Sequence, residues 1–244
     1  MRRRPGLRCR SMPLTRLPSI ERLTLAVVEA VPEWHPAHAT FEPFPVHAWL
    51  VRHPDGAILV DAGVGIGDPS IDAWYRPSVT RLGDALGAIG VDLSEVAALV
   101  LSHLHFDHCG QQAALTAPVF VQAIEHEAAQ ADGYTVPDWA AIAHGRLRLV
   151  HGDDEVAEGF HLLATPGHSP GHQSVLIEAG DDRVVLAAQC AFHAAELRSG
   201  EPATSNLHDA AWEAPARDSL RRIRSLGPAA CELSHDPQVV VVDR

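Results

Sequence analysis

Residues 103 to 108 read HLHFDH and place three histidines and one aspartate within six positions. Imidazole nitrogens and carboxylate oxygens are ligands that suit zinc and similar divalent metals. The apolar run VAALVLS directly precedes the cluster and is typical of a short buried strand. His103 and His105 are two residues apart on extended backbone, so their side chains point the same way and can reach one cation. The cluster therefore predicts a metal site at the end of a strand.

Further ligands are expected from the same turn and from two later loops. Asp107 and His108 come at the predicted start of a helix, which turns them toward a neighbouring position. His168 lies in TPGHSPGH, where proline and glycine predict a turn, and His235 follows an apolar run in ELSHDP. Loops that follow the strands of a rigid scaffold commonly carry the ligands of a metal site. These residues complete the candidate ligand set.

The elements that must position these residues alternate between strands and helices. Apolar runs bounded by Gly, Pro and Asp predict strands over 23–31, 46–51, 57–65, 96–102, 118–122, 146–156, 159–167, 172–180, 182–190 and 229–237. Apolar residues at helical spacing predict helices over 70–90, 123–131 and 216–227. This order indicates two sheets covered by helices. Because no linker or repeat is apparent, residues 23–244 are expected to form one domain after a flexible arm over residues 1–22.

The composition limits the partners and the location of the protein. A chain of 244 residues with 46% hydrophobic residues suits a globular domain with a sizeable core. The net charge of −12 and the absence of lysine argue against nucleic acid as a partner. No apolar run approaches the roughly 18 residues that span a bilayer, so no membrane partner is expected. The four cysteines are scattered and the basic N-terminus lacks the apolar stretch of a signal peptide, which together predict a cytoplasmic protein.

The motifs resemble those of the metallo-β-lactamase superfamily and, within it, those of bacterial N-acyl-homoserine lactonases. The resemblance rests on SHLHFDHCG, TPGHSPGHQS and the late His-Asp pair, and it runs from about residue 23 to the C-terminus. It implies an α/β fold, an αβ/βα four-layer sandwich with the metal site at one edge between two sheets. It also implies that Asp61 orients a ligand histidine. The implied ligands are His103, His105 and His168 for one metal, and Asp107, His108 and His235 for the other.

Two positions depart from the lactonase pattern. The lactonases usually provide an aspartate that bridges both metals, and the matching residue here is Gln189, a candidate ligand without charge. Phe192 matches a tyrosine that lies near the substrate carbonyl, and it lacks the hydroxyl group. Cys190 and His193 are close enough in sequence to replace the lost ligand, although a thiol at a strand end is more often packed in the core. His172 is expected to support the site rather than to bind metal.

The expected activity is metal-dependent hydrolysis of a lactone or ester, with N-acyl-homoserine lactones as the first substrates to test. Zinc, as one or two divalent ions, lowers the pKa of bound water from about 16 toward about 7, and the resulting hydroxide attacks the carbonyl. Asp107 is expected to bind metal and also to pass a proton to the leaving alkoxide. The second ion is expected to bind weakly because of Gln189. Trp74 and Tyr75 either line a substrate channel or take part in ordinary helix packing.

Two alternative functions stay open at this point. A thioester hydrolase similar to glyoxalase II uses nearly the same ligands, but it would want a basic patch for glutathione, which this acidic chain does not indicate. A degenerate member of the family would keep the fold and one metal with little activity, and both Gln189 and Phe192 favour it. The sequence is also compatible with a homodimer.

Overall fold

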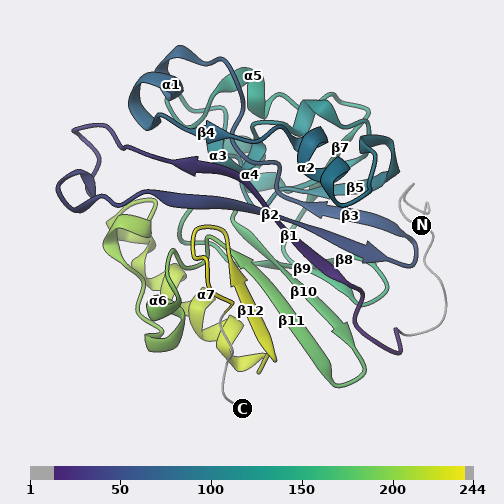
Figure 1. Ribbon diagram of the computed structural model, residues 1–244. Helices are drawn as coiled ribbons and strands as arrows, with labels where there is room; N and C mark the ends of the chain where they lie inside the picture. The colour runs from purple at the N-terminus through teal and green to yellow at the C-terminus, as the bar shows by residue number, and fades with distance from the viewer. Residues whose placement is uncertain (1–13, 240–244) are drawn as a thin grey trace.

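Two β-sheets form the centre of the computed structural model, which describes residues 14–239 (Figure 1). The seven-stranded sheet contains β1 (Ile20–Val28), β2 (Phe44–His53), β3 (Gly56–Val60), β4 (Ser78–Val79), β5 (Val96–Val100), β6 (Val119–Gln122) and β7 (Leu147–Val150). The five-stranded sheet contains β8 (Asp154–Ala157), β9 (Phe160–Ala164), β10 (Gln173–Ala179), β11 (Asp182–Ala188) and β12 (Ala230–Leu233). The strand orders are β4-β1-β2-β3-β5-β6-β7 and β12-β11-β10-β9-β8.

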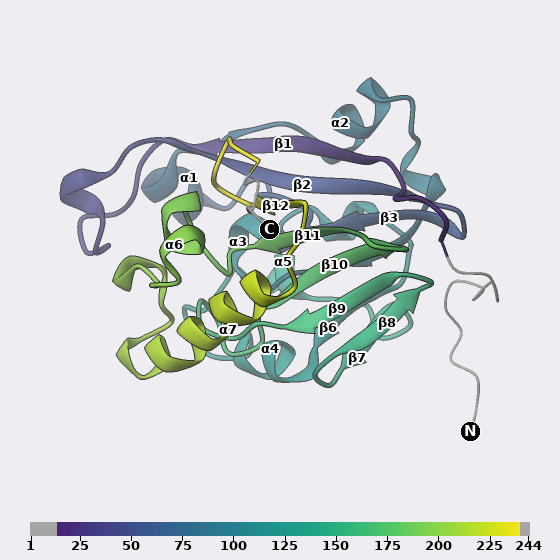
Figure 2. The same cartoon turned by 90° about the horizontal axis from the view of Figure 1, so that it is seen from below.

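Helices accompany each of the two sheets. Those that belong with the seven-stranded sheet are α1 (Pro69–Tyr75), α2 (Leu82–Ala88), α3 (Phe106–Cys109), α4 (Ala123–Ala128) and α5 (Pro137–Ala140). Those that belong with the five-stranded sheet are α6 (Ala194–Ser199) and α7 (Glu213–Ser225), which lie together on one side of the molecule in Figure 2. Within residues 14–239, no helix has both the length and the apolar character needed to cross a membrane.

Separate apolar clusters show that the molecule has four layers. Between the two sheets, Trp49 of the first sheet packs in one cluster with Phe160 and Ile177 of the second. Leu86 of α2 belongs to a second cluster, on the outer face of the seven-stranded sheet. Ile223 of α7 belongs to a third, on the outer face of the five-stranded sheet. Burying apolar surface on both faces of each sheet stabilises this αβ/βα arrangement. The predicted α/β fold, a four-layer sandwich, is confirmed.

The N-terminal boundary differs from the predicted one. Strand β1 begins at Ile20, because the backbone of β1 pairs with β2 from Ile20 opposite Val51 onward. Residues 20–22 are therefore part of the sheet and not of the predicted arm over residues 1–22. Residues 1–13 of that arm lie outside the described part of the chain.

Two other predicted elements are divided in the structure. The predicted helix over residues 70–90 is two helices, α1 and α2, with the short strand β4 between them. Pro77 accounts for this division, since proline removes a backbone donor and disfavours helix in the preceding residue. The predicted strand over residues 146–156 is β7 and β8, which belong to different sheets. The turn between them uses Gly152 with φ 75°, a conformation that favours glycine.

The strand directions bring the loops with candidate ligands to one edge. Strand β11 is parallel to β12 and antiparallel to β10, which is itself antiparallel to β9. The C-terminal ends of β9, β11 and β12 therefore point the same way, and the loop after each carries a candidate ligand. Gln173 at the start of β10 joins this edge to the other sheet, because its backbone N–H donates to Ser102 O at 2.8 Å and its amide donates to Leu101 O at 2.8 Å.

Candidate metal centre

Three imidazoles meet at the edge between the sheets and form the first triad, His103, His105 and His168. The first two follow β5 and the third lies on the loop after β9. His103 Nε2 lies 3.1 Å from His105 Nδ1, and His168 Nε2 lies 3.2 Å from His103 Nε2. His105 Nδ1 lies 3.0 Å from His168 Nε2, which closes a nearly equilateral triangle of ring nitrogens.

The hydrogen bonds on the far side of two of these rings fix where their protons lie. His168 Nδ1 lies 3.0 Å from the carbonyl oxygen of Asn206, so this nitrogen carries the proton and Nε2 carries a lone pair. Ser102 Oγ donates to Asp61 and therefore accepts from His103 Nδ1 at 3.0 Å. The Nε2 atom of His103 then also carries a lone pair. Two lone pairs thus face each other across 3.2 Å, an arrangement that a cation between them would stabilise.

The spacing of the first triad fits a tetrahedral metal ion. At a Zn–N distance of about 2.0–2.1 Å, neighbouring ligands of a tetrahedral site are about 3.3 Å apart. The three observed separations are 3.0, 3.1 and 3.2 Å. Three protein ligands leave one position open, as in catalytic zinc sites. The residues present therefore suit zinc or a similar divalent ion.

A second group of ligand atoms, the second triad, consists of Asp107, His108 and His235. Asp107 and His108 lie on α3, as predicted, and His235 follows β12. The Asp107 Oδ2 atom lies 3.6 Å from His108 Nε2 and 3.5 Å from His235 Nε2. Gln189 is at the same place, with its Oε1 atom 3.1 Å from each of these nitrogens. The amide oxygen thus joins the second triad and is available as a fourth ligand there.

Burial favours the neutral, metal-binding form in four of the five triad histidines. It lowers the pKa of His105 to about 4 and that of His235 to about 4. Burial, together with the neighbouring histidines, also lowers the pKa values of His103 and His168 well below the ordinary value. His108 differs from the others. Burial disfavours its charged form too, but the carboxylates of Asp107 and Asp61 outweigh that effect and raise the pKa of His108 to about 9.

Asp61 connects the two triads through hydrogen bonds. Its buried carboxylate accepts from His108 Nδ1 at 2.8 Å and from the Ser102 hydroxyl at 2.8 Å. Since Ser102 Oγ in turn accepts from His103, one carboxylate orients a ligand of each triad. Asp61 has φ 63° and Ala188, directly before Gln189, has φ 50°. Such backbone conformations cost on the order of 1–3 kcal/mol in non-glycine residues and concentrate at functional sites.

The turn that carries the signature depends on a close approach of two backbones. The Gly110 N–H donates to Gly63 O at 2.8 Å, and the Ala62 N–H donates to His108 O at 2.7 Å. A Cβ atom at Gly110 would lie 1.9 Å from the backbone nitrogen of Gly65, so only glycine fits there. This contact fixes α3 against the loop after β3 and thereby sets the direction of Asp107.

Other residues predicted near the site take supporting positions. His172 uses both ring nitrogens on the protein: Nδ1 lies 3.0 Å from Thr165 O, and Nε2 accepts from the Gln189 N–H at 3.1 Å. Cys190 is buried in the apolar cluster beneath α6 and α7, and burial raises the pKa of its thiol to about 12. His193 is exposed. Neither Cys190 nor His193 joins a group of candidate metal-ligand atoms among residues 14–239, whereas the Gln189 Oε1 atom lies beside the second triad.

Aromatic side chains border the second triad. Phe192 stacks on His235 with ring centroids 4.8 Å apart. Tyr75 packs against Phe106 with ring centroids 4.4 Å apart. Trp74 is 47% exposed, and its ring meets that of Trp34, which is 67% exposed, at 6.0 Å. These two tryptophans form an exposed aromatic pair, and Trp74 belongs to α1.

The sequence patterns did not point to three polar residues that support the ligands. Ser102 relays a hydrogen bond between Asp61 and His103, and Asn206 accepts from His168 through its backbone oxygen. Glu125 is completely buried and bonded to both histidine loops. Each acts through a contact between distant segments, so no local spacing marks it in the sequence.

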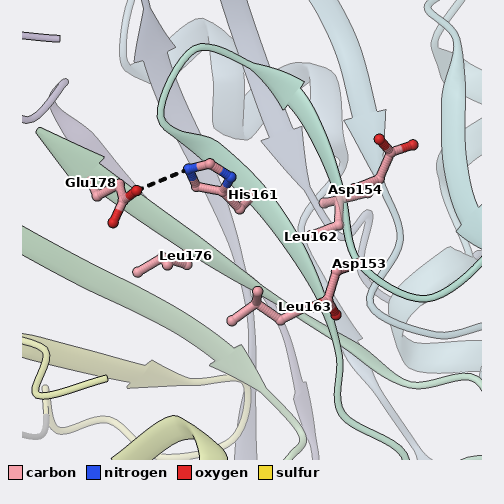
Figure 3. Close-up of a pocket in the computed structure, with 7 residues that line it drawn as sticks. All are labelled: Asp153, Asp154, His161, Leu162, Leu163, Leu176 and Glu178. Atoms are coloured by element: carbon pink, nitrogen blue, oxygen red, sulfur yellow. Dashed lines mark ion pairs between the residues drawn. The ribbon is translucent and has the colours of Figure 1, made fainter. Parts of the chain in front are cut away.

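A hollow on the five-stranded sheet is distinct from the metal centre. Figure 3 shows it over β8, β9 and β10, where His161 Nε2 lies 3.2 Å from Glu178 Oε1. Asp153, at its margin, forms an ion pair with Arg222. None of the lining residues belongs to either triad.

Comparison with known proteins agrees with this architecture. A family model described as the metallo-beta-lactamase superfamily matches residues 41–235. An N-acyl homoserine lactonase of Bacillus thuringiensis subsp. kurstaki is 35% identical over 155 residues, which cover 58% of this chain and 62% of that protein. One from Rhizobium radiobacter is 31% identical over 175 residues, with 58% and 63% coverage. The match thus spans less than two thirds of the length of these curated relatives.

Solved structures share the fold along almost the whole chain. The crystal structure of a quorum-quenching N-acyl homoserine lactone lactonase superposes with a TM-score of 0.76 at 27% identity, covering 93% of this chain and 95% of that one. A dizinc quorum-quenching lactonase of 18% identity shares the fold with a TM-score of 0.69. The family predicted from the histidine motifs is confirmed. The chain belongs to the metallo-beta-lactamase superfamily.

Proposed function

We propose that this protein is a metal-dependent hydrolase that opens lactones, with N-acyl homoserine lactones as the first substrate class. The observation that carries this proposal is the first triad, where the lone pairs of His103 and His168 face each other across 3.2 Å. Without a cation this contact is unfavourable, whereas with one each nitrogen has a partner. Relatives named as N-acyl homoserine lactonases support the choice of substrate.

The residues that would hold metal are divided between the two triads. His103, His105 and His168 would bind one ion, and the second triad together with Gln189 would bind another. Zinc is the metal proposed, because imidazole and carboxylate ligands at this spacing suit it. A bound divalent zinc ion supplies an activated water near neutral pH and polarises a carbonyl oxygen.

Asp107 is the proposed proton carrier. Its side chain is 10% exposed and lies beside both His108 and His235, so the carboxylate can both hold a cation and reach a substrate at the edge of the site. Ring opening of a lactone leaves an alkoxide that must take up a proton. A carboxylate held within hydrogen-bond reach of that oxygen can deliver it.

The aromatic residues around the second triad favour a substrate with an apolar acyl group. Phe192 lies flat on His235, and Phe44 meets both rings edge-on at 5.0 and 4.8 Å. Phe106, which directly precedes Asp107 in the chain, packs against Tyr75. Trp74, next to Tyr75 in the chain, adds an exposed aromatic side chain. A small polar ester would leave most of this surface unused.

A second candidate is a family member that binds metal but turns over substrate slowly. Gln189 favours it, because a neutral amide cannot offset the repulsion between two divalent ions as a carboxylate does. Phe192 favours it too, because it offers no hydroxyl to a developing oxyanion. A thioester hydrolase is less well supported, since the chain has a net charge of −12 and no lysine.

We also propose a cytoplasmic location. Cys109, Cys190 and Cys231 are buried free thiols. This cysteine pattern is usual for proteins of reducing compartments.

The proposed function is tested with a panel of substrates on metal-free and zinc-loaded protein. We expect zinc-dependent opening of N-acyl homoserine lactones, with slower hydrolysis of aryl esters and of glutathione thioesters. His105→Ala removes one ligand of the first triad and should abolish all of these activities. Preference for a thioester would replace the lactonase proposal, and no turnover on any of the three classes would favour the slow metal-binding member.

A further inference from the structure

Glu125 is a fully buried carboxylate on α4 that accepts four hydrogen bonds. Its Oε1 atom accepts from the Leu104 backbone N–H at 2.9 Å and from the Tyr134 hydroxyl at 2.6 Å. Its Oε2 atom accepts from the Ser169 hydroxyl at 2.7 Å and from the Gly171 backbone N–H at 2.9 Å. A carboxylate is tolerated in the interior when donors fill its acceptor positions, as they do here.

The partners of Glu125 belong to the two loops that carry the first triad. Leu104 lies between His103 and His105, and Ser169 directly follows His168. One carboxylate therefore joins the loop after β5 to the loop after β9. It does so at the point where both loops direct imidazoles toward the same centre.

The chain is fitted closely around this carboxylate. A Cβ atom at Gly171 would lie 2.4 Å from the Glu125 backbone nitrogen, so a larger residue would push the two segments apart. The Tyr134 ring, whose hydroxyl donates to Glu125, packs against the His105 imidazole with centroids 4.8 Å apart. A displacement of Glu125 would therefore move the histidines of the first triad, through both loops and through the Tyr134 ring.

The charge of Glu125 also bears on the first triad. Its hydrogen-bond partners are two hydroxyls and two backbone N–H groups, and no arginine is among them. The three histidines are neutral ligands, so a divalent ion held by them brings two positive charges into a buried region without a charged ligand. A nearby buried carboxylate offsets part of that cost, and the ion in turn offsets the cost of burying the carboxylate.

We propose that Glu125 is a positioning residue for the first metal site. It holds the His103–His105 loop and the His168 loop at the separation that one metal ion requires, and it supplies negative charge that favours a cation there. Glu125 touches neither substrate nor metal in this role. The inference rests on the proposed metal site, and its test is designed to separate the two.

The test measures zinc affinity by calorimetric titration of metal-free wild type, Glu125→Gln and Glu127→Gln. Glutamine at residue 125 keeps the size, removes the charge and turns one acceptor into a donor that faces other donors. We expect the Kd of the tighter site to rise about 10- to 100-fold in Glu125→Gln, the usual effect of residues that orient metal ligands. The visible spectrum of cobalt bound at that site should change as well. Glu127 is exposed on the same helix, so Glu127→Gln is the matched control and should leave both properties unchanged.

Metal-free circular dichroism separates positioning from folding. If Glu125→Gln is folded without metal and binds zinc as tightly as wild type, the inference is wrong. If Glu125→Gln does not fold, Ser169→Ala decides, because it removes one hydrogen bond and keeps the charge. A several-fold weaker site in Ser169→Ala supports the inference, and an unchanged site overturns it. His105→Ala should eliminate the tighter zinc site whether or not the inference about Glu125 is right. If the tighter site persisted in His105→Ala, the proposed metal site itself would be wrong.

Discussion

The substitution Gln189→Glu tests how the second triad holds a cation. It replaces an amide by a carboxylate of the same length, and the Oε1 atom of residue 189 lies 3.1 Å from the Nε2 atoms of both His108 and His235. A metal ion bound by these nitrogens would therefore lie close to the new charge. Aspartate, the residue usual in the lactonases, is one methylene shorter and is a less closely matched change.

The expected gain in zinc-binding free energy is the difference between the attraction of the new carboxylate for the ion and the costs that oppose it. A unit charge and a divalent cation about 4 Å apart attract each other by about 8 kcal/mol at an effective dielectric constant near 20. Removing a carboxylate from water costs several kcal/mol. The new charge also favours the proton on His108, whose pKa is about 9 before metal binds, and this proton competes with the ion. We expect a net gain of about 1.4 to 2.8 kcal/mol, which lowers the Kd of the second site about 10- to 100-fold.

Calorimetric titration of zinc into metal-free wild type and Gln189→Glu measures this difference directly. Gln130→Glu, a change of the same kind at an exposed position, is the control and should titrate as wild type does. Wild type should show one tight and one weaker site. If the second site of Gln189→Glu bound zinc no more tightly than that of wild type while the first site was intact, the assignment of Gln189 to the second triad would be refuted.

Three further results are expected. Asp61→Asn should weaken zinc binding at both sites by about 10-fold or more, because Asp61 orients His108 directly and a ligand of the first triad through Ser102. The zinc content of the protein after dialysis would show this, and loss of zinc from one site alone would contradict it. Burial lowers the pKa of His172 from 6.5 to about 3, so His172 gains a proton at a higher pH in the unfolded chain than in the folded one. The unfolding free energy of metal-free protein should therefore fall as the pH drops from about 6.5 toward about 3. A free energy from urea unfolding that did not vary over this range would exclude the effect. Phe192→Tyr should raise kcat for lactones by about 10²-fold with little change in KM, whereas an unchanged kcat would show that the hydroxyl does not reach the carbonyl.

Local spacing was enough to predict the histidines and Asp107 of the two triads, whereas Asp61 and Gln189 were identified through the resemblance to the lactonases. The alternation in HLHFDH sends His103 and His105 to one side of an extended segment, and the following helix turns Asp107 away from them. His168 and His235 could be predicted because each follows a strand at a turn of proline, glycine or aspartate. Such information lies within a few neighbouring residues, and periodicity arguments detect it.

Contacts between distant segments could not be predicted in this way. Glu125 bonds to residues 44 and 46 positions away, and nothing in the helix around it distinguishes this glutamate from its exposed neighbour Glu127. The division of residues 146–156 between two sheets depended on pairing partners, because β7 joins β6 and β8 joins β9. An apolar run specifies a strand, but its partner is selected by packing in the whole domain.

Zinc titration of metal-free protein during hydrolysis of an N-acyl homoserine lactone tests the central claim most directly. The expected result is no ring opening without metal, and turnover that rises as zinc fills the triads. Ring opening by fully metal-free protein would contradict this account. So would zinc binding at both triads without any ring opening.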